Sequence, residues 1–151
     1  MESIKSQIDS ILRRKDNRLA AIADEIAEEV KKELREVVYN EWFASFTPTV
    51  YERTGEVIDS ITAEVKKDGR CNYTVRVFFD YDKIRPHYLD GSWNAHAGFD
   101  GVKFAEGLIA SMDKGMGGSP NNPRYGEAAM FIDAVQQYAG NLAKKLLKQK
   151  L

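Results

Sequence analysis

Apolar residues in the first third of the chain recur at a helical spacing. Every fourth position from 22 to 46 is apolar: Ile22, Ile26, Val30, Leu34, Val38, Trp42 and Phe46. Charged residues fill much of the rest, a division typical of an amphipathic helix with one buried face. A shorter apolar series runs from Ile4 to Leu12. We therefore expect helix over residues 1–46, either continuous or as two helices that meet near Asp16.

The strict four-residue spacing has a consequence for what covers this helix. An α-helix has about 3.6 residues per turn, so such a stripe drifts slowly around the helix surface. A drifting stripe suits a helix that crosses a sheet within its own subunit. It equally suits a helix that another subunit partly covers, and the pattern leaves both possibilities open.

The middle of the chain has the period-two pattern of β-strands. Apolar and polar residues alternate from Ile61 to Lys66 and again from Cys71 to Phe79. Asp68-Gly69 lies between the two runs, and Asp-Gly is a favoured hairpin turn because both residues tolerate positive φ. We therefore expect a Thr-Gly turn followed by a β-hairpin within residues 51–80, with Cys71 as a small residue at the start of the second strand.

The rest of the chain predicts a loop region and a second strong helix. Residues 81–116 read as an aromatic-rich loop followed by a short helix around Phe104 to Met112, and residues 115–124 form a Gly/Pro loop. Apolar residues spaced by three and four positions predict a C-terminal helix over 126–150. The expected fold is a single α+β domain over residues 1–151. Its small antiparallel sheet, a hairpin at about 61–80, is packed by the long N-terminal helix and the C-terminal helix.

Composition narrows the function classes. The chain has 151 residues and a formal net charge of -1. That balance is unlike the basic excess of a nonspecific nucleic-acid binder, although Arg13, Arg14 and the C-terminal lysines leave a DNA contact as one hypothesis. The single cysteine excludes an internal disulfide framework and multi-cysteine zinc modules. No stretch of about 18 residues is apolar and uncharged, so we expect no membrane contact.

One cluster could hold a metal. His87, Asp90 and His96 lie close in sequence and have side chains that bind divalent cations. Their spacing matches no metal signature with a known mechanism, and aromatic neighbours favour packing roles for both histidines. We find no nucleophile elbow and no phosphate-binding loop. We therefore expect no catalytic residues and no cofactor, and keep a small metal-dependent enzyme as the alternative of a different class.

A short motif carries the functional information. Thr54-Gly55 reads as a turn before one helical turn, and Ser60-Ile61 then enters the hairpin. With Val57 at its leucine position, this segment resembles the Thr-Gly-x-Leu-x-x-Ser-Ile signature of a family of tailed-phage tail components, the head–tail joining or tail-completion proteins. The order of helix, turn, hairpin and closing helix is also similar to that family.

The resemblance implies a structural virion protein and not an enzyme. It implies a homo-oligomeric ring, typically a hexamer, at the neck of a tailed bacteriophage. Neighbouring connector or adaptor proteins and tail-tube or tail-terminator proteins would be its partners, with DNA nearby. Its location would be the virion, and the host cytoplasm during assembly; a role as tail terminator, adaptor or minor capsid protein is the alternative. Candidate interface residues are the large aromatics Trp42, Phe43, Phe46, Tyr88, Trp93 and Phe99, which could instead complete the subunit's own core.

Overall fold

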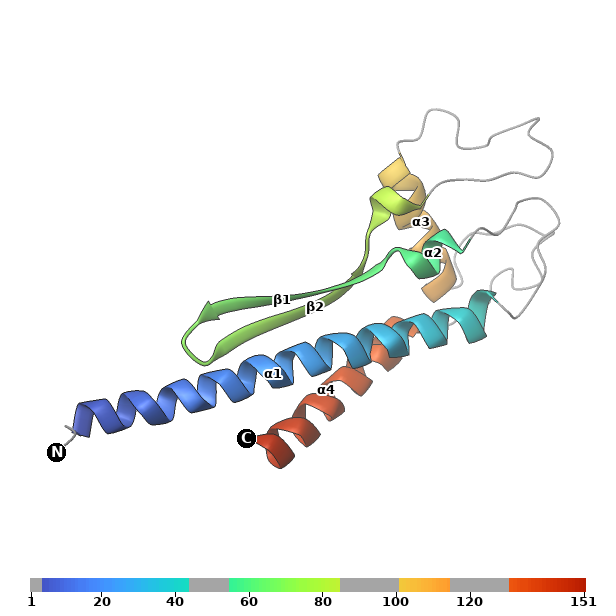
Figure 1. Ribbon diagram of the computed structural model, residues 1–151. Coiled ribbons are helices and arrows are strands. Elements are labelled where there is room, and N and C mark those ends of the chain that lie inside the picture. Colours follow the sequence, from blue (N-terminus) through green and yellow to red (C-terminus); the bar gives the residue numbers. More distant parts are fainter. Residues whose placement is uncertain (1–3, 44–54, 85–100, 115–130) are drawn as a thin grey trace, which may run out of the picture.

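The computed structural model describes residues 4–43, 55–84, 101–114 and 131–151 (Figure 1). The helices are α1 (Ile4–Val38), α2 (Glu56–Asp59), α3 (Gly101–Lys114) and α4 (Phe131–Lys150). The strands are β1 (Ile61–Gly69) and β2 (Asn72–Phe79), and short π and 3-10 helical turns follow at Tyr39–Phe43 and Tyr81–Lys83. The α+β prediction is confirmed: a long N-terminal helix, an antiparallel hairpin and a C-terminal helix.

Helix α1 is continuous over 35 residues and passes straight through Asp16, so the alternative of two helices with a joint at that residue is wrong. Its buried face comprises Ile22, Ala23, Ala27, Val30, Leu34 and Val38. The described part of the predicted stripe, from Ile22 to Val38, is therefore buried, with Ile26 half-buried. After Val38 the helix widens into the π-helical turn, which ends the described segment at Phe43.

Strands β1 and β2 pair antiparallel from Ile61 opposite Phe79 to Gly69 opposite Asn72. Within the described residues the sheet has these two strands. Alternate residues of β2 point toward α1, as the period-two pattern predicts. On the other face, the Arg76 guanidinium lies 5.1 Å from the centroid of the Phe78 ring. The sheet alone is too small to enclose a core and depends on α1.

The hairpin turns at Arg70-Cys71, so the expected turn at Asp68-Gly69 is wrong. The register is irregular between Lys67 and Gly69, and Cys71 takes the left-handed conformation with φ 59°. A residue other than glycine rarely adopts this conformation. The Cys71 amide donates to the Asp16 carboxylate at 2.9 Å, so a contact with α1 offsets the local preference of Asp-Gly.

The core lies at one end of α1. Buried side chains from the C-terminal half of α1, the base of the hairpin, α3 and the start of α4 form one cluster: Val30, Leu34, Val38, Ile61, Ile84, Ala105, Ile109, Met112, Phe131 and Val135. Helix α4 runs back along α1 until Lys150 pairs with Glu25 at 2.6 Å. The N-terminal half of α1 extends past this core, alongside the hairpin (Figure 1).

Candidate functional site

Most of the predicted interface and metal-ligand residues lie outside the described residues. This applies to Phe46, Thr54, Tyr88, Trp93 and Phe99, and to His87, Asp90 and His96. Trp42 and Phe43 belong to the π-helical turn, and their side chains are outside the described part. Of the family-like motif, the structure places Gly55, Val57, Ser60 and Ile61.

Gly55 and Ser60 form a tight corner around α2. Gly55 has φ 80°, a left-handed conformation that suits glycine, and its carbonyl accepts the Asp59 amide at 3.0 Å. Ser60 is fully buried, and its Oγ donates to the Val57 carbonyl at 2.7 Å. The glycine begins the helical turn and the serine closes it.

The same corner fixes the base of the hairpin. The Ser60 carbonyl accepts the Asp80 amide at 2.8 Å and the Thr62 hydroxyl at 3.1 Å, which ties the start of β1 to the residue after β2. Ile61, 2% exposed, enters the core directly after it. The family-like motif is thus a structural corner that sets the angle of the hairpin against the helices.

The hairpin tip is anchored on α1 by Asp16, a role that the sequence did not predict. One carboxylate oxygen accepts the Cys71 amide at 2.9 Å and the Tyr73 hydroxyl at 3.0 Å, and the other accepts Lys67 Nζ at 2.5 Å. The hydrogen bond from Lys67, then that from Cys71, lowers the pKa of Asp16 to about 2. Asp16 interrupts an otherwise apolar helix face between Leu12 and Leu19, and that interruption is the signal that could have revealed a partner.

A second contact holds the tip further along α1. Arg70 reaches Asp9, with its guanidinium 3.3 Å from the carboxylate and 3.3 Å from the Asp9 carbonyl oxygen. Lys67 also lies over the Tyr73 ring, 5.6 Å from its centroid, and the hydrogen bond to Asp16 raises the pKa of Lys67. The tip therefore contacts α1 at Asp9 and Asp16, about two helical turns apart.

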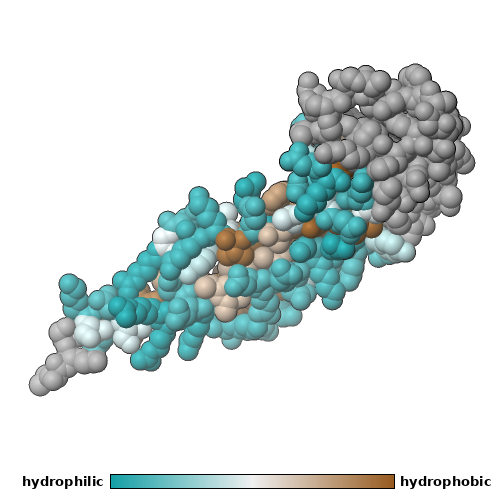
Figure 2. Space-filling view, turned by 45° about the horizontal axis from the view of Figure 1, so that its top comes forward, coloured by the Kyte–Doolittle hydropathy of each residue, from teal (hydrophilic) through white to brown (hydrophobic). Residues whose placement is uncertain are grey.

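The N-terminal part of α1, residues 4–18, contains both contacts and forms a segment that we call the arm. Its apolar residues Ile4, Ile8 and Ile11 are 76%, 50% and 53% exposed. Helix α4 ends beside Glu25, and the described elements leave these three side chains in water. Figure 2 shows one face of the elongated described part, where hydrophilic side chains cover most of the arm and hydrophobic ones gather toward the middle.

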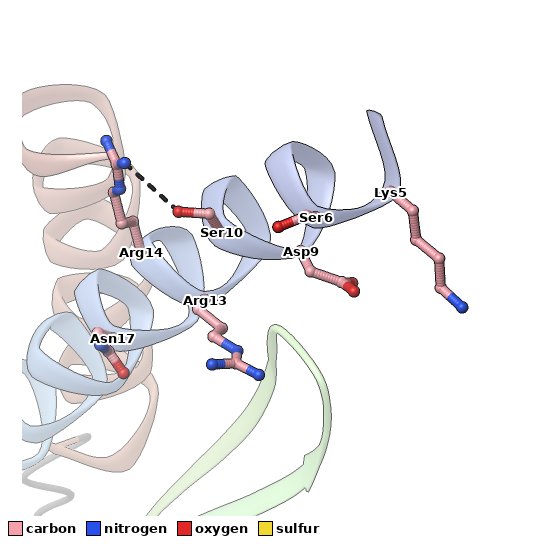
Figure 3. A pocket seen from close by; sticks show the side chains of 7 residues that line it. All are labelled: Lys5, Ser6, Asp9, Ser10, Arg13, Arg14 and Asn17. Atoms are coloured by element: carbon pink, nitrogen blue, oxygen red, sulfur yellow. Dashed lines mark hydrogen bonds between the residues drawn. The ribbon is translucent and has the colours of Figure 1, made fainter. Parts of the chain in front are cut away.

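The other side of the arm is polar and has a shallow hollow (Figure 3). Its lining comes from α1 alone: Lys5, Ser6, Asp9, Ser10, Arg13, Arg14 and Asn17. Arg14 donates to the Ser10 hydroxyl at 3.4 Å within the helix. Such a one-helix hollow does not enclose a small molecule, since ligand pockets bury most of the ligand surface. The arm thus offers a surface suited to contact with a macromolecule.

The described residues contain no group of three or more His, Cys, Asp or Glu side chains placed to hold a metal ion. Among the described helices, none has the length and apolar character to cross a membrane. Comparison with known proteins finds no matching family model, no matching curated protein and no matching solved structure.

Proposed function

We propose that this protein is a structural virion protein of a tailed phage, which assembles as a homo-oligomeric ring at the head–tail neck and acts in tail completion or head–tail joining. The observation that supports it most is the exposure of Ile4, Ile8 and Ile11 on the arm. A run of exposed apolar side chains along one helix marks a protein–protein contact. The exposure of these three isoleucines is explained if a neighbouring copy covers them in the ring.

The geometry of the family-like motif supports the same proposal. Gly55, Ser60 and Ile61 build the corner that joins the helices to the hairpin base. A corner of this kind determines the shape of the subunit, so the motif that resembles the phage family carries a role in architecture. A protein that acts by assembly needs a defined shape more than it needs reactive groups.

The elongated subunit suits a ring. Neighbours in a ring meet through heterologous contacts, in which one patch meets a different patch on the next copy. The arm extends past the core at one end, and the core cluster lies at the other. A projecting segment at one end of each subunit can reach the body of the next, which closes a ring around a central channel.

Native mass spectrometry and negative-stain microscopy of the purified protein test the assembly. We expect a single closed oligomer, a hexamer by the family resemblance, with an open centre. Immunogold labelling of phage particles should then place the protein at the neck, between connector or adaptor proteins and tail-tube or tail-terminator proteins. A purified protein that stays monomeric, or particles that lack it, would contradict the proposal; label elsewhere on the particle would favour a minor capsid or other virion role.

A further inference from the structure

The charges of α1 are divided between its two halves. The arm, residues 4–18, has five basic and two acidic residues, whereas residues 24–41 have seven acidic and three basic residues. Both acidic residues of the arm already pair with the hairpin tip, Asp9 with Arg70 and Asp16 with Lys67. The arm therefore presents mostly uncompensated positive charge, and the second half of the helix presents mostly negative charge.

Helix stability within one subunit does not explain this division. The positive end of a helix dipole is its N-terminus, where acidic residues are favourable and basic residues are unfavourable. The first turn of α1 contains no acidic residue and includes Lys5, which opposes the dipole. The other four basic residues of the arm lie at positions 13–18, beyond the turn in which the dipole acts. The dipole therefore does not account for the positive charge of the arm, and a contact outside the subunit does.

The same arm carries the exposed apolar residues. From Ile4 to Ile22, where the buried face of α1 begins, the helix rises about 27 Å. Ile4, Ile8 and Ile11 lie along this length at spacings of four and three, which is the pattern of a helix that lays one face on a partner surface. The partner must therefore offer an elongated surface with negative charge.

We propose that the arm of one copy docks on the acidic half of α1 in a second copy, in a head-to-tail contact; this inference rests on the proposed ring. On the arm, Lys15 and Arg18 continue the spacing of Ile4, Ile8 and Ile11 by four and three residues, so they lie on the same side of the helix. Lys5, Arg13 and Arg14 line the polar hollow on the other side. The exposed acidic residues of segment 24–41 in the second copy are Asp24, Glu28, Glu29, Glu36 and Glu41. Tyr39 in the same region is 49% exposed and offers apolar surface to the isoleucines.

Charge complementarity selects this partner. An arm-to-arm contact would place basic residues against basic residues, and like charges at an interface disfavour the pairing. A nucleic acid would satisfy the basic residues but would leave the isoleucines in water. The chain's own acidic segment satisfies the charges and is long enough, since residues 24–41 span about 26 Å.

A charge exchange between two variants of the full chain tests the contact. The first variant is Lys15→Glu with Arg18→Glu, which lie on the isoleucine side of the arm, and the second is Glu28→Lys with Glu29→Lys; all four positions are exposed. Either variant alone places like charges together, so we expect self-association weaker by at least about tenfold in sedimentation velocity. An equimolar mixture restores opposite charges, and we expect it to associate nearly as well as the original protein.

A matched control uses exposed charges elsewhere. Lys144→Glu with Lys145→Glu reverses two exposed lysines of α4, and its self-association should stay unchanged. Circular dichroism checks that every variant is folded. A further variant, Ile8→Asp with Ile11→Asp, should lose self-association. It should also fail to associate when mixed with the Glu28→Lys, Glu29→Lys variant, since no charge exchange restores the apolar contact.

The outcomes separate this inference from the proposed ring. If the protein forms its oligomer and the arm variants do not weaken it, or the mixture fails to reassociate, the head-to-tail contact is wrong and the ring proposal stands. If the original protein is monomeric, both are wrong. If the original protein binds DNA in a salt-dependent way, and the arm variants lose that binding but keep their self-association, the arm is a nucleic-acid contact and the inference is overturned.

Discussion

Replacing Phe131 with alanine tests whether the core described here holds the fold together. Phe131 is fully buried at the first residue of α4 and belongs to the cluster shared by α1, the hairpin, α3 and α4. Its ring meets Phe79 of β2 edge-on, with 6.1 Å between centroids and 65° between ring planes. No other described ring pair links α4 to the hairpin in this way.

The size of the effect follows from this burial. Truncation of a buried phenylalanine to alanine costs about 3–5 kcal/mol, of which an edge-to-face pair accounts for about 0.5–1.5 kcal/mol. Domains of this size have about 5–15 kcal/mol of stability in total. At roughly 2–4 °C per kcal/mol, the melting temperature should fall by on the order of 10 °C.

Urea unfolding followed by circular dichroism measures the loss, at a protein concentration below that of self-association. Leu147→Ala on the same helix is the matched control, because Leu147 is 39% exposed and its truncation should cost less than about 1 kcal/mol. Phe79→Ala and the double variant then isolate the pair energy. A cost for Phe131→Ala no larger than that for Leu147→Ala would refute the reasoning about the core.

Four further predictions concern the corner and the anchor. The pKa of Asp16 is about 2 in the folded protein against 3.8 for a free carboxyl, so its contribution to stability is present above about pH 4 and is lost as the pH falls toward 2. Asp16→Asn should therefore lower the urea midpoint at pH 7. In this variant the midpoint should also fall less steeply between about pH 4 and pH 2. Gly55→Ala should destabilise the protein by about 1–2 kcal/mol, because a side chain is strained at φ 80°. Cys71→Gly should be neutral or stabilising by up to about 1 kcal/mol, because glycine adopts φ 59° without strain. Thermal unfolding measures both changes. Ser60→Ala should cost about 1–2 kcal/mol through the lost hydrogen bond to the Val57 carbonyl, and an unchanged urea midpoint would contradict that role.

The sequence was informative where periodicity reflects a local backbone preference. The spacing of apolar residues predicted both long helices and the hairpin, because a helix and a strand repeat at 3.6 and 2 residues whatever they pack against. Helix α3 extends from Gly101 to Lys114, beyond its predicted Phe104–Met112 core, because terminal turns carry little apolar signal.

The hairpin turn and the Asp16 anchor could not be predicted in the same way. Asp68-Gly69 has the stronger local preference, but the Asp16 carboxylate is more than 50 positions away in sequence and supplies the hydrogen bond that favours a turn at Arg70-Cys71. The sequence pattern allows a joint between two helices at the same residue, because aspartate is common at helix starts. Long-range contacts of this kind have no signature in a local window of residues.

The continuity of α1 has a mechanical consequence. At about 1.5 Å per residue its 35 residues form a strut about 50 Å long. The hairpin tip contacts this helix at Asp9 and Asp16, and the core packs against it near Val38. If a neighbouring molecule tilted the arm, the whole helix would rotate as a rigid body, since α1 has no joint between the hairpin contacts and the core. In the proposed ring, each subunit would in this way pass a change in geometry from one face to the other without unfolding.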